Sequence, residues 1–302
     1  MKKIVFVWVI IYSISSYGKI EEVHQLPHGN YALPTSQQPG PLFSFGQNIV
    51  DKKDVQAYLF VDYFRGKNIC IDQYTPSIFY GISDNSTILL ALPAFSKLKN
   101  GLQQATGAGD FFAQIEYAYY KRDSLYDGSQ STIVASLTFP TGSIKKQPPT
   151  GLGATSFFLG ATASYMDFDW YYFASLGATL PTSPSPFKNI YFYQLGVSRN
   201  IYYKTNQWIL NALLEIDGIY TDHQLGVNGA TAKNSGGHTL FIGPSIWFST
   251  QRLIIQAGFS FPLAQVLFGD QNKIDFQFSV NIGWKFNSSP DEKNDDAENG
   301  DD

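Results

Sequence analysis

The chain has 302 residues, of which 16% are aromatic and only 15% are charged, whereas typical soluble domains carry about 25% charged residues. The single cysteine, Cys70, excludes an intramolecular disulfide framework. The formal net charge is −4, but the last sixteen residues hold seven acidic side chains and one lysine, so the remainder carries +2. The composition therefore disfavours an ordinary soluble globule and a basic surface for nucleic acid.

The first eighteen residues have the form of a secretory signal. Lys2 and Lys3 give a positive start, an apolar stretch follows, and the small residues Ser16 and Gly18 are placed for cleavage. The apolar stretch is too short to cross a hydrocarbon core of roughly 30 Å, so a membrane-anchoring helix is the weaker alternative. We predict that residues 1–18 are removed on export.

Residues 19–54 are rich in Pro, Gly and Gln and lack a clear hydrophobic period. Two interpretations are open for this segment, a periplasmic linker and a small plug that enters a lumen. The composition alone favours the linker.

The clearest strand lies near the C-terminus. From Ile274 to Phe286, apolar residues occupy every even position, and polar residues or glycine occupy every odd one. This alternation exceeds the roughly 5–6 residues of soluble strands and matches the ~9–11 residues of a tilted strand that crosses a bilayer. The segment is therefore predicted to form part of a membrane wall.

Similar alternation predicts eleven more strands, separated by turns and loops that alternate in length, as in a barrel with one short-turn rim and one long-loop rim. Unpaired backbone groups cost several kcal/mol each in lipid, so the first strand must pair with the last. We predict an all-β fold, a transmembrane antiparallel up-and-down β-barrel of about 12 strands over residues 55–286, in the outer membrane and with both termini in the periplasm. The additional strands are predicted at residues 55–64, 72–82, 86–95, 109–120, 130–140, 155–166, 170–180, 190–201, 207–218, 238–248 and 253–263, and the long loops at 97–108, 141–154, 181–188, 220–237 and 264–273.

A soluble barrel or sandwich is the alternative, because alternation also describes half-buried strands. The distribution of large side chains argues against it. Aromatic residues recur at the ends of the apolar faces, where membrane interfaces place them, and the opposite faces are Gly, Ser, Thr, Gln and Asn. These aromatic residues include Tyr165, Trp170, Trp208, Trp284 and Phe286.

Three short motifs occur in order along the middle of the chain: Gly107-Ala-Gly-Asp110, Pro140-Thr-Gly142 and Gly151-Leu-Gly153. With these motifs the region from Gln56 to Phe286 resembles the outer-membrane transporter family named for the MetA pathway of phenol degradation. The resemblance implies an outer-membrane barrel that admits small, often apolar or aromatic compounds. The glycines themselves indicate turns or close backbone approach and locate no substrate site.

The end of the last strand resembles the signal that the barrel-assembly machinery reads. Gly283, Trp284 and Phe286 are the residues of this candidate assembly signal, and the machinery and membrane lipid are the partners it implies. Residues 287–302 follow it as an acidic tail that we expect to be disordered.

The polar faces of the predicted strands point into the lumen. They carry more acidic than basic groups, which predicts a mild preference for cations or neutral solutes, although the same carboxylates can serve as structural pegs. Inward-facing aromatic residues predict a narrowed or apolar path, or packing against an inserted loop. The candidate lumen-lining residues are Phe60, Asp62, Phe112, Gln114, Glu116, Phe173, Glu215, Asp217 and Phe241, with Phe158 and Trp247 on the same register and Lys285 near the periplasmic end.

Enzymatic chemistry has little support in the sequence. A hydrolase needs a histidine placed beside a nucleophile or an activated water, but Asp222 and His223 are adjacent, and His238 lacks a serine motif. His24 and His28 form no metal-ligand spacing, and no cofactor fingerprint is present. Passive passage of small solutes is the leading hypothesis, and a surface-interaction or structural role through the loop at 220–237 is the alternative.

Overall fold

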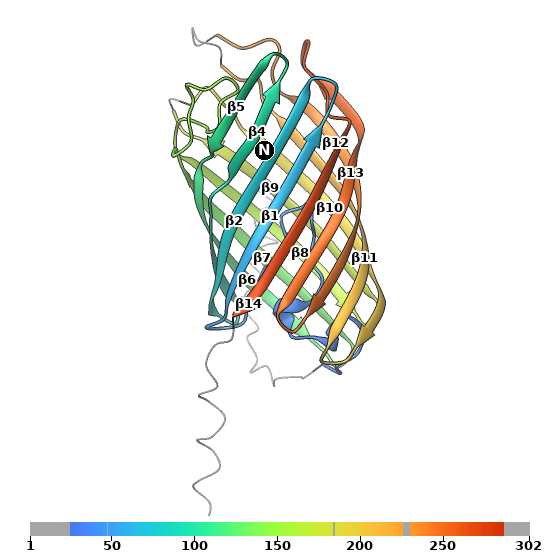
Figure 1. Ribbon diagram of the computed structural model, residues 1–302. Coiled ribbons are helices and arrows are strands. Elements are labelled where there is room, and N and C mark those ends of the chain that lie inside the picture. The colour runs from blue at the N-terminus through green and yellow to red at the C-terminus, as the bar shows by residue number, and fades with distance from the viewer. Residues whose placement is uncertain (1–24, 47, 184, 226–229, 287–302) are drawn as a thin grey trace, which may run out of the picture.

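The computed structural model describes most of the chain, and the part that it describes contains no α-helix (Figure 1). None of its helical segments is long and apolar enough to cross a membrane. The predicted signal peptide (1–18) and acidic tail (287–302) lie outside the described residues. The described ranges are 25–46, 48–183, 185–225 and 230–286.

Two short 3-10 helices, η2 (Gly29–Ala32) and η3 (Thr35–Gln37), precede the strands. The strands are β1 (Val55–Arg65), β2 (Ile69–Ser83), β3 (Ser86–Ala91), β4 (Ala94–Asn100), β5 (Gln103–Ala108), β6 (Phe111–Asp123), β7 (Asp127–Phe139), β8 (Ser156–Asp167), β9 (Trp170–Pro181), β10 (Ile190–Lys204), β11 (Trp208–Thr221), β12 (Gly237–Thr250), β13 (Leu253–Leu267) and β14 (Phe276–Phe286).

The barrel is closed, antiparallel and 12-stranded, as predicted. The fourteen labelled strands make twelve strands of the wall because two of these are each interrupted once and so carry two labels. β3 and β4 lie one after the other along β2, with Leu92 and Pro93 between them. Proline cannot donate a ladder hydrogen bond, which accounts for the interruption. β5 and β6 continue each other in the same way across Gly109 and Asp110.

Pairing of β1 with β14 closes the ring, and the register places Val55 opposite Phe286. Short turns connect the strands at one rim, the inner rim, whereas the outer rim holds longer loops after β7, β9, β11 and β13 and short turns after β1 and β4. The prediction of a loop over residues 97–108 was wrong, because β4 and β5 form a hairpin there that extends past the neighbouring strands at the outer rim (Figure 1).

The outward face of the barrel is apolar at mid-height, where Leu176 is 66% and Leu195 56% exposed. Exposed aromatic side chains lie nearer both rims, the distribution that girdles of a transmembrane barrel show. A face of this kind requires a hydrocarbon surrounding. Exposed aromatic residues toward the inner rim include Tyr165, Tyr172, Tyr202 and Trp284, and those toward the outer rim include Phe139, Tyr191, Tyr193 and Tyr220.

Candidate functional site: the lumen and the segment inside it

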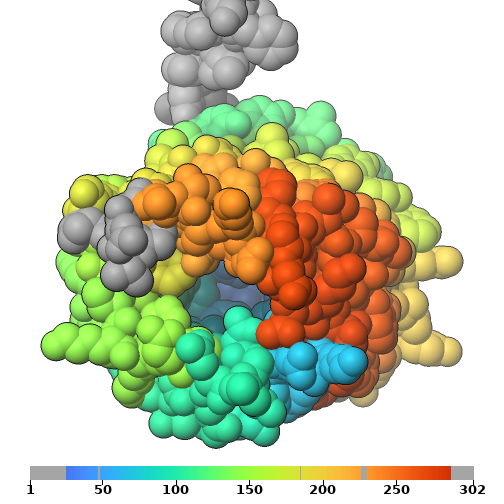
Figure 2. Space-filling model, turned by 90° about the horizontal axis from the view of Figure 1, so that it is seen from above, coloured from blue at the N-terminus to red at the C-terminus, as the bar shows by residue number. Residues whose placement is uncertain are grey.

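Residues 25–54, named here the lumenal segment, lie inside the barrel against its inner wall (Figure 1). Residue 47 of this segment is outside the described residues. The sequence left both a periplasmic linker and a lumenal plug open for this region. Viewed from the outer rim, the lumen is open at the top and blue N-terminal residues form its floor (Figure 2).

The first part of the lumenal segment follows the inner rim. Asn30 donates its backbone N–H to the Phe168 carbonyl at 2.8 Å, and the Asn206 N–H donates to the Ala32 carbonyl at 2.8 Å. The Tyr31 hydroxyl donates to the Met166 carbonyl at 2.7 Å. Burial, together with nearby carboxylates of the rim turns, raises the pKa of Tyr31 well above its ordinary value, so its hydroxyl remains a donor.

The middle part rises to carboxylates at mid-height in the barrel. Glu215 accepts the backbone N–H groups of Leu42, Phe43 and Ser44 at 2.8, 3.2 and 3.0 Å. Asp217 accepts the Ser44 hydroxyl at 2.5 Å. A fully buried carboxylate is costly unless donors satisfy it, and here the lumenal segment supplies the donors.

A third carboxylate holds the segment on the opposite wall. Glu116, on β6, accepts the Asn48 backbone N–H at 2.6 Å and is fully buried. Two residues further on, Val50 donates its N–H to the Thr87 hydroxyl at 2.8 Å. The segment therefore spans the lumen from β11 to β3 and β6.

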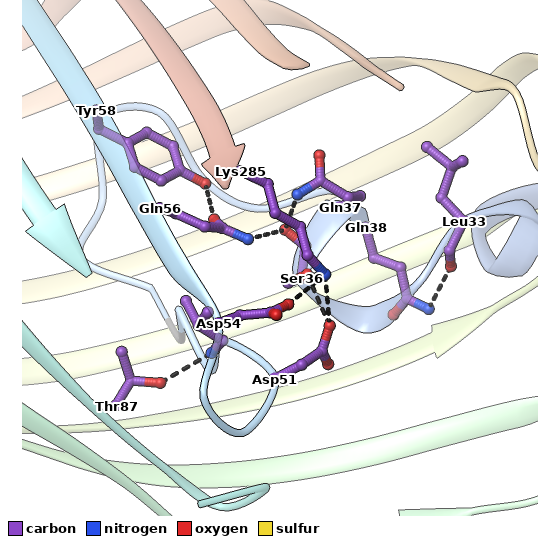
Figure 3. A network of polar contacts seen from close by, with 11 residues as sticks. Leu33, Ser36, Gln37, Gln38, Asp51, Asp54, Gln56, Tyr58, Thr87 and Lys285 are labelled. Atoms are coloured by element: carbon purple, nitrogen blue, oxygen red, sulfur yellow. Dashed lines mark hydrogen bonds and ion pairs between the residues drawn. The ribbon is translucent and has the colours of Figure 1, made fainter. Parts of the chain in front are cut away.

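A charged network closes the segment onto the last strand at the inner rim (Figure 3). Lys285 points toward Ser36, Asp51 and Asp54 in this view, and forms ion pairs with both aspartates. The Lys285 ammonium also donates to the Ser36 hydroxyl at 3.1 Å. Since Lys285 is the penultimate residue of β14, one side chain connects the segment to the seam of the barrel.

Aromatic packing fixes the tip of the segment. The Phe45 ring meets Phe158 edge to face at 5.0 Å, and its carbonyl accepts the Ser175 hydroxyl at 2.8 Å. Gly160 and Gly177 lie beneath these rings, where any Cβ would collide with Phe158 and Phe45. Glycine at these two positions therefore makes the room that the tip occupies.

Within the described residues, cavities lie beside the lumenal segment at three heights of the barrel. The outer cavity of 450 Å³ lies toward the long loops, and the central cavity of 280 Å³ lies beside β1, β2 and β6. The inner cavity of 120 Å³ lies toward the short turns of the inner rim. Ser44 lines the central cavity and Asp217 lines the outer cavity, so their hydrogen bond marks the boundary between the two.

The predicted lumen residues fall into separate groups. Glu116, Glu215 and Asp217 contact the lumenal segment. Phe173 is buried against Tyr171, its ring stacked at 5.7 Å, and lines none of the three cavities. Phe60, Asp62, Phe112 and Gln114 line the central cavity, and Phe241 lines the outer one.

The candidate assembly residues lie on both faces of β14. Trp284 and Phe286 point outward with 46% and 50% exposure. Gly283 faces the lumen, against the ring of Tyr58.

Polar residues that sequence reasoning did not single out also hold the segment. Gln194 accepts the Phe45 N–H at 3.0 Å, and Asn211 donates to the Asn30 side chain at 2.6 Å. In the sequence these two residues are marked only by their inward-facing positions. Every polar residue of the lumen has such a position, so the sequence does not distinguish the residues that bind the segment.

The three glycine-containing motifs come together at the outer rim around Asp110. The Asp110 carboxylate accepts the backbone N–H groups of Gly142 and Leu152 at 2.8 and 2.6 Å. A Cβ on Gly151 would collide with this carboxylate. The motifs therefore join the long loop between β7 and β8 to the junction of β5 and β6.

The histidines in the described residues do not assemble a catalytic site. His223 stacks on Phe268 at 4.3 Å, whereas His238 contacts the hydroxyl of Tyr193. His28 interacts with Tyr203 at the inner rim. His24 lies outside the described residues, and within them no group of three potential ligands could hold a metal ion.

No family model matches the chain, and no curated protein matches it significantly, so the resemblance to the phenol-degradation family stays a prediction. Solved structures do match. An outer-membrane channel from Pseudomonas putida F1 aligns over 78% of this chain and 97% of that chain, with a TM-score of 0.66 at 13% identity. The NanC porin aligns over 76% of this chain and 100% of that chain, with a TM-score of 0.50 at 10% identity.

At these identities the similarity concerns the fold, which is that of outer-membrane barrels. Together with the apolar outward face, it defines the class of protein: an outer-membrane β-barrel whose lumen contains its own N-terminal segment.

Proposed function

We propose that the barrel is a passive channel for small solutes, with apolar or aromatic compounds as the preferred class. The observation that carries this proposal is the pair of lumenal cavities, both lined by aromatic and polar side chains. Phe192 and Phe241 line the outer cavity, and Phe60 and Phe112 line the central one. Such rings offer contact area to an apolar solute, and the polar groups between them orient it.

The lumenal segment limits what can pass. It occupies mid-height, where Ser44 and Phe45 contact β11 and β9, and Asn48 contacts Glu116 on the opposite wall. A 12-stranded barrel is already narrower than 16-stranded porins, so a segment inside it restricts passage to small molecules. The structural similarity to an outer-membrane channel supports the same class of function.

Proteoliposome swelling tests this proposal with the full mature chain refolded from detergent. We expect swelling in small solutes, a steep loss of rate as solute size increases, and faster entry of phenylalanine than of glutamine, a zwitterion of similar size without a ring. A matched Phe60→Leu, Phe112→Leu variant should reduce the difference between the two amino acids. Absence of swelling and of single-channel conductance above protein-free liposomes would reject the channel and favour a surface-interaction role.

A further inference from the structure

The central cavity holds a lumenal carboxylate that the lumenal segment does not engage. Asp62, on β1, accepts the Ser279 hydroxyl at 2.5 Å and the Gln277 amide at 3.3 Å. Both bonds end on Oδ1, which leaves Oδ2 for another partner. Within the part of the chain that the structure describes, no lysine or arginine pairs with Asp62.

The strand register leaves space beside this carboxylate. Small residues continue its row of inward-facing positions across the neighbouring strands, and Ser279 of this row lines the cavity beside Asp62. The next row toward the inner rim carries larger side chains and forms a floor. The first row consists of Ser245, Gly258, Ser279 and Asp62, and the second of Trp247, Gln256, Asn281 and Phe60.

Aromatic rings line the same cavity as Asp62. Phe60 and Phe112 both line it, and Trp247 lies on its floor. Tyr58 stacks on Phe60 at 5.7 Å and holds that ring in position. Ring faces attract cations, most strongly where water is excluded.

Four buried polar atoms of these two rows lack a hydrogen-bond partner among the described residues, and two of them belong to side chains that line the central cavity. These two are the indole N–H of Trp247 and the amide oxygen of Asn281, both on side chains that are 5% exposed. Unpaired buried polar groups are costly, so they favour a ligand that carries a hydrogen-bonding group.

The cavity has room for an aromatic molecule. Cavities of roughly 150 Å³ already admit benzene, and the central cavity measures 280 Å³. A single ring with a short polar arm therefore fits. A carboxylate without a nearby cation favours a positively charged arm, because an anionic or neutral one leaves the desolvated charge uncompensated.

We propose that the central cavity binds a small organic cation, a compound with an aromatic or apolar body and one ammonium group. Asp62 provides the counter-charge, while Phe60, Phe112 and Trp247 surround the body. This inference rests on the proposed channel function, since it names the solute class that the channel prefers. Glu116, Glu215 and Asp217 each accept hydrogen bonds from the lumenal segment, whereas Asp62 lines the central cavity and accepts only from the barrel wall.

Isothermal titration of the full mature chain in detergent tests the site with three probes that share a ring: phenethylammonium, phenethyl alcohol and phenylacetate. We expect phenethylammonium to bind about tenfold more tightly than the alcohol, because its contact with the carboxylate is charge-assisted. Asp62→Asn should abolish this difference. The matched control Asp72→Asn changes an aspartate on the outward face that pairs with Arg65, and it should keep the preference.

Equal binding of the cation and the alcohol, a preference that survives in Asp62→Asn, or no binding of any probe would overturn the proposal. Phe112→Leu provides a second readout. It should weaken the binding of both phenethylammonium and phenethyl alcohol while leaving the ratio of their affinities largely unchanged. A heat-dependent shift in gel mobility shows that each variant is folded. Cation binding without liposome swelling would reject the channel function and support the cation site. Swelling without a preference for the cation would support the channel function and reject the cation site.

Discussion

The lumenal glutamates act as acceptors for backbone N–H groups of the lumenal segment. Glu215 receives three consecutive N–H groups, from Leu42 to Ser44. Three donors in a row fix the position of a short peptide without any regular secondary structure. Carboxylates outnumber cations in the lumen, and most of them accept hydrogen bonds from the lumenal segment in place of an ion pair.

Glu215→Ala should loosen the lumenal segment. It leaves three N–H groups without an acceptor, and each buried unsatisfied group costs roughly 1–3 kcal/mol. We expect higher single-channel conductance and faster proteolysis around residue 43, while the barrel keeps its heat-dependent gel mobility.

The matched control is Glu215→Gln, which retains one acceptor oxygen and should give an intermediate conductance. Wild-type conductance and protease resistance in the alanine variant would show that the remaining contacts, such as the aromatic packing of Phe45, hold the segment without Glu215.

Asp110 should hold the long outer loop between β7 and β8. Asp110→Ala removes the acceptor for two backbone N–H groups, those of Gly142 and Leu152. We expect the loop to become accessible, with trypsin cleaving after Lys145 or Lys146 much faster than in the wild type.

Asp84→Ala, in a turn at the inner rim, is the control and should not change cleavage of the outer loop. Unchanged cleavage in Asp110→Ala would mean that the contact of Lys146 with the Thr106 carbonyl is sufficient to hold it.

Among the elements, strands within the membrane were predictable and those beyond it were not. Alternation identifies the segments that face lipid, because every outward position there must be apolar. The hairpin of β4 and β5 rises past its neighbours and carries Lys97 and Lys99 on its outward positions. Lipid does not require apolar side chains on that part of the wall, so its sequence lacks the alternation that identifies a membrane strand and resembles the sequence of a loop.

The position of the lumenal segment was also beyond sequence reasoning. Its contacts are mostly single hydrogen bonds between its backbone and side chains far away in the chain, for example Gly40 with Gln256 at 3.0 Å. Contacts of this kind need no hydrophobic period. The inward register of Glu116 and Glu215 followed from alternation, but their partners did not.

Replacing residues 41–46 by a Gly-Ser sequence of equal length should open the lumen. The replacement removes Phe45 and the Ser44 hydroxyl, both of which contact the wall. We expect conductance to increase several-fold and larger solutes to enter liposomes, whereas the barrel still closes because β1 pairs with β14 independently of these residues.

A replacement that narrows or abolishes conductance would indicate that residues 41–46 keep the lumen open rather than restrict it. A scrambled segment with the same composition distinguishes loss of specific contacts from loss of bulk.

For the whole molecule, the seam between the first and last strands decides assembly. Phe286 faces lipid opposite Val55 at the inner end of this seam. We expect Phe286→Asp to reduce insertion into the outer membrane strongly, because a charged group on the lipid face is costly and the assembly signal is altered. The measurement is the amount of heat-modifiable, surface-exposed protein in cells.

Phe286→Leu serves as the apolar control and should insert better than the aspartate variant. Deletion of residues 287–302 should leave insertion intact. Normal insertion of Phe286→Asp would refute the signal, and failure of the deletion variant would assign assembly information to the tail.

The ion pairs between Lys285 and the two aspartates of the lumenal segment join residues more than two hundred positions apart in the chain. Residues near position 50 leave the translocation machinery long before β14, so their partner is the last to arrive. Contacts of such large sequence separation form late, since chain entropy opposes them until the ring is complete. We therefore expect these ion pairs to form only when the barrel closes, so that residues 51–54 take their place in the lumen at the end of folding.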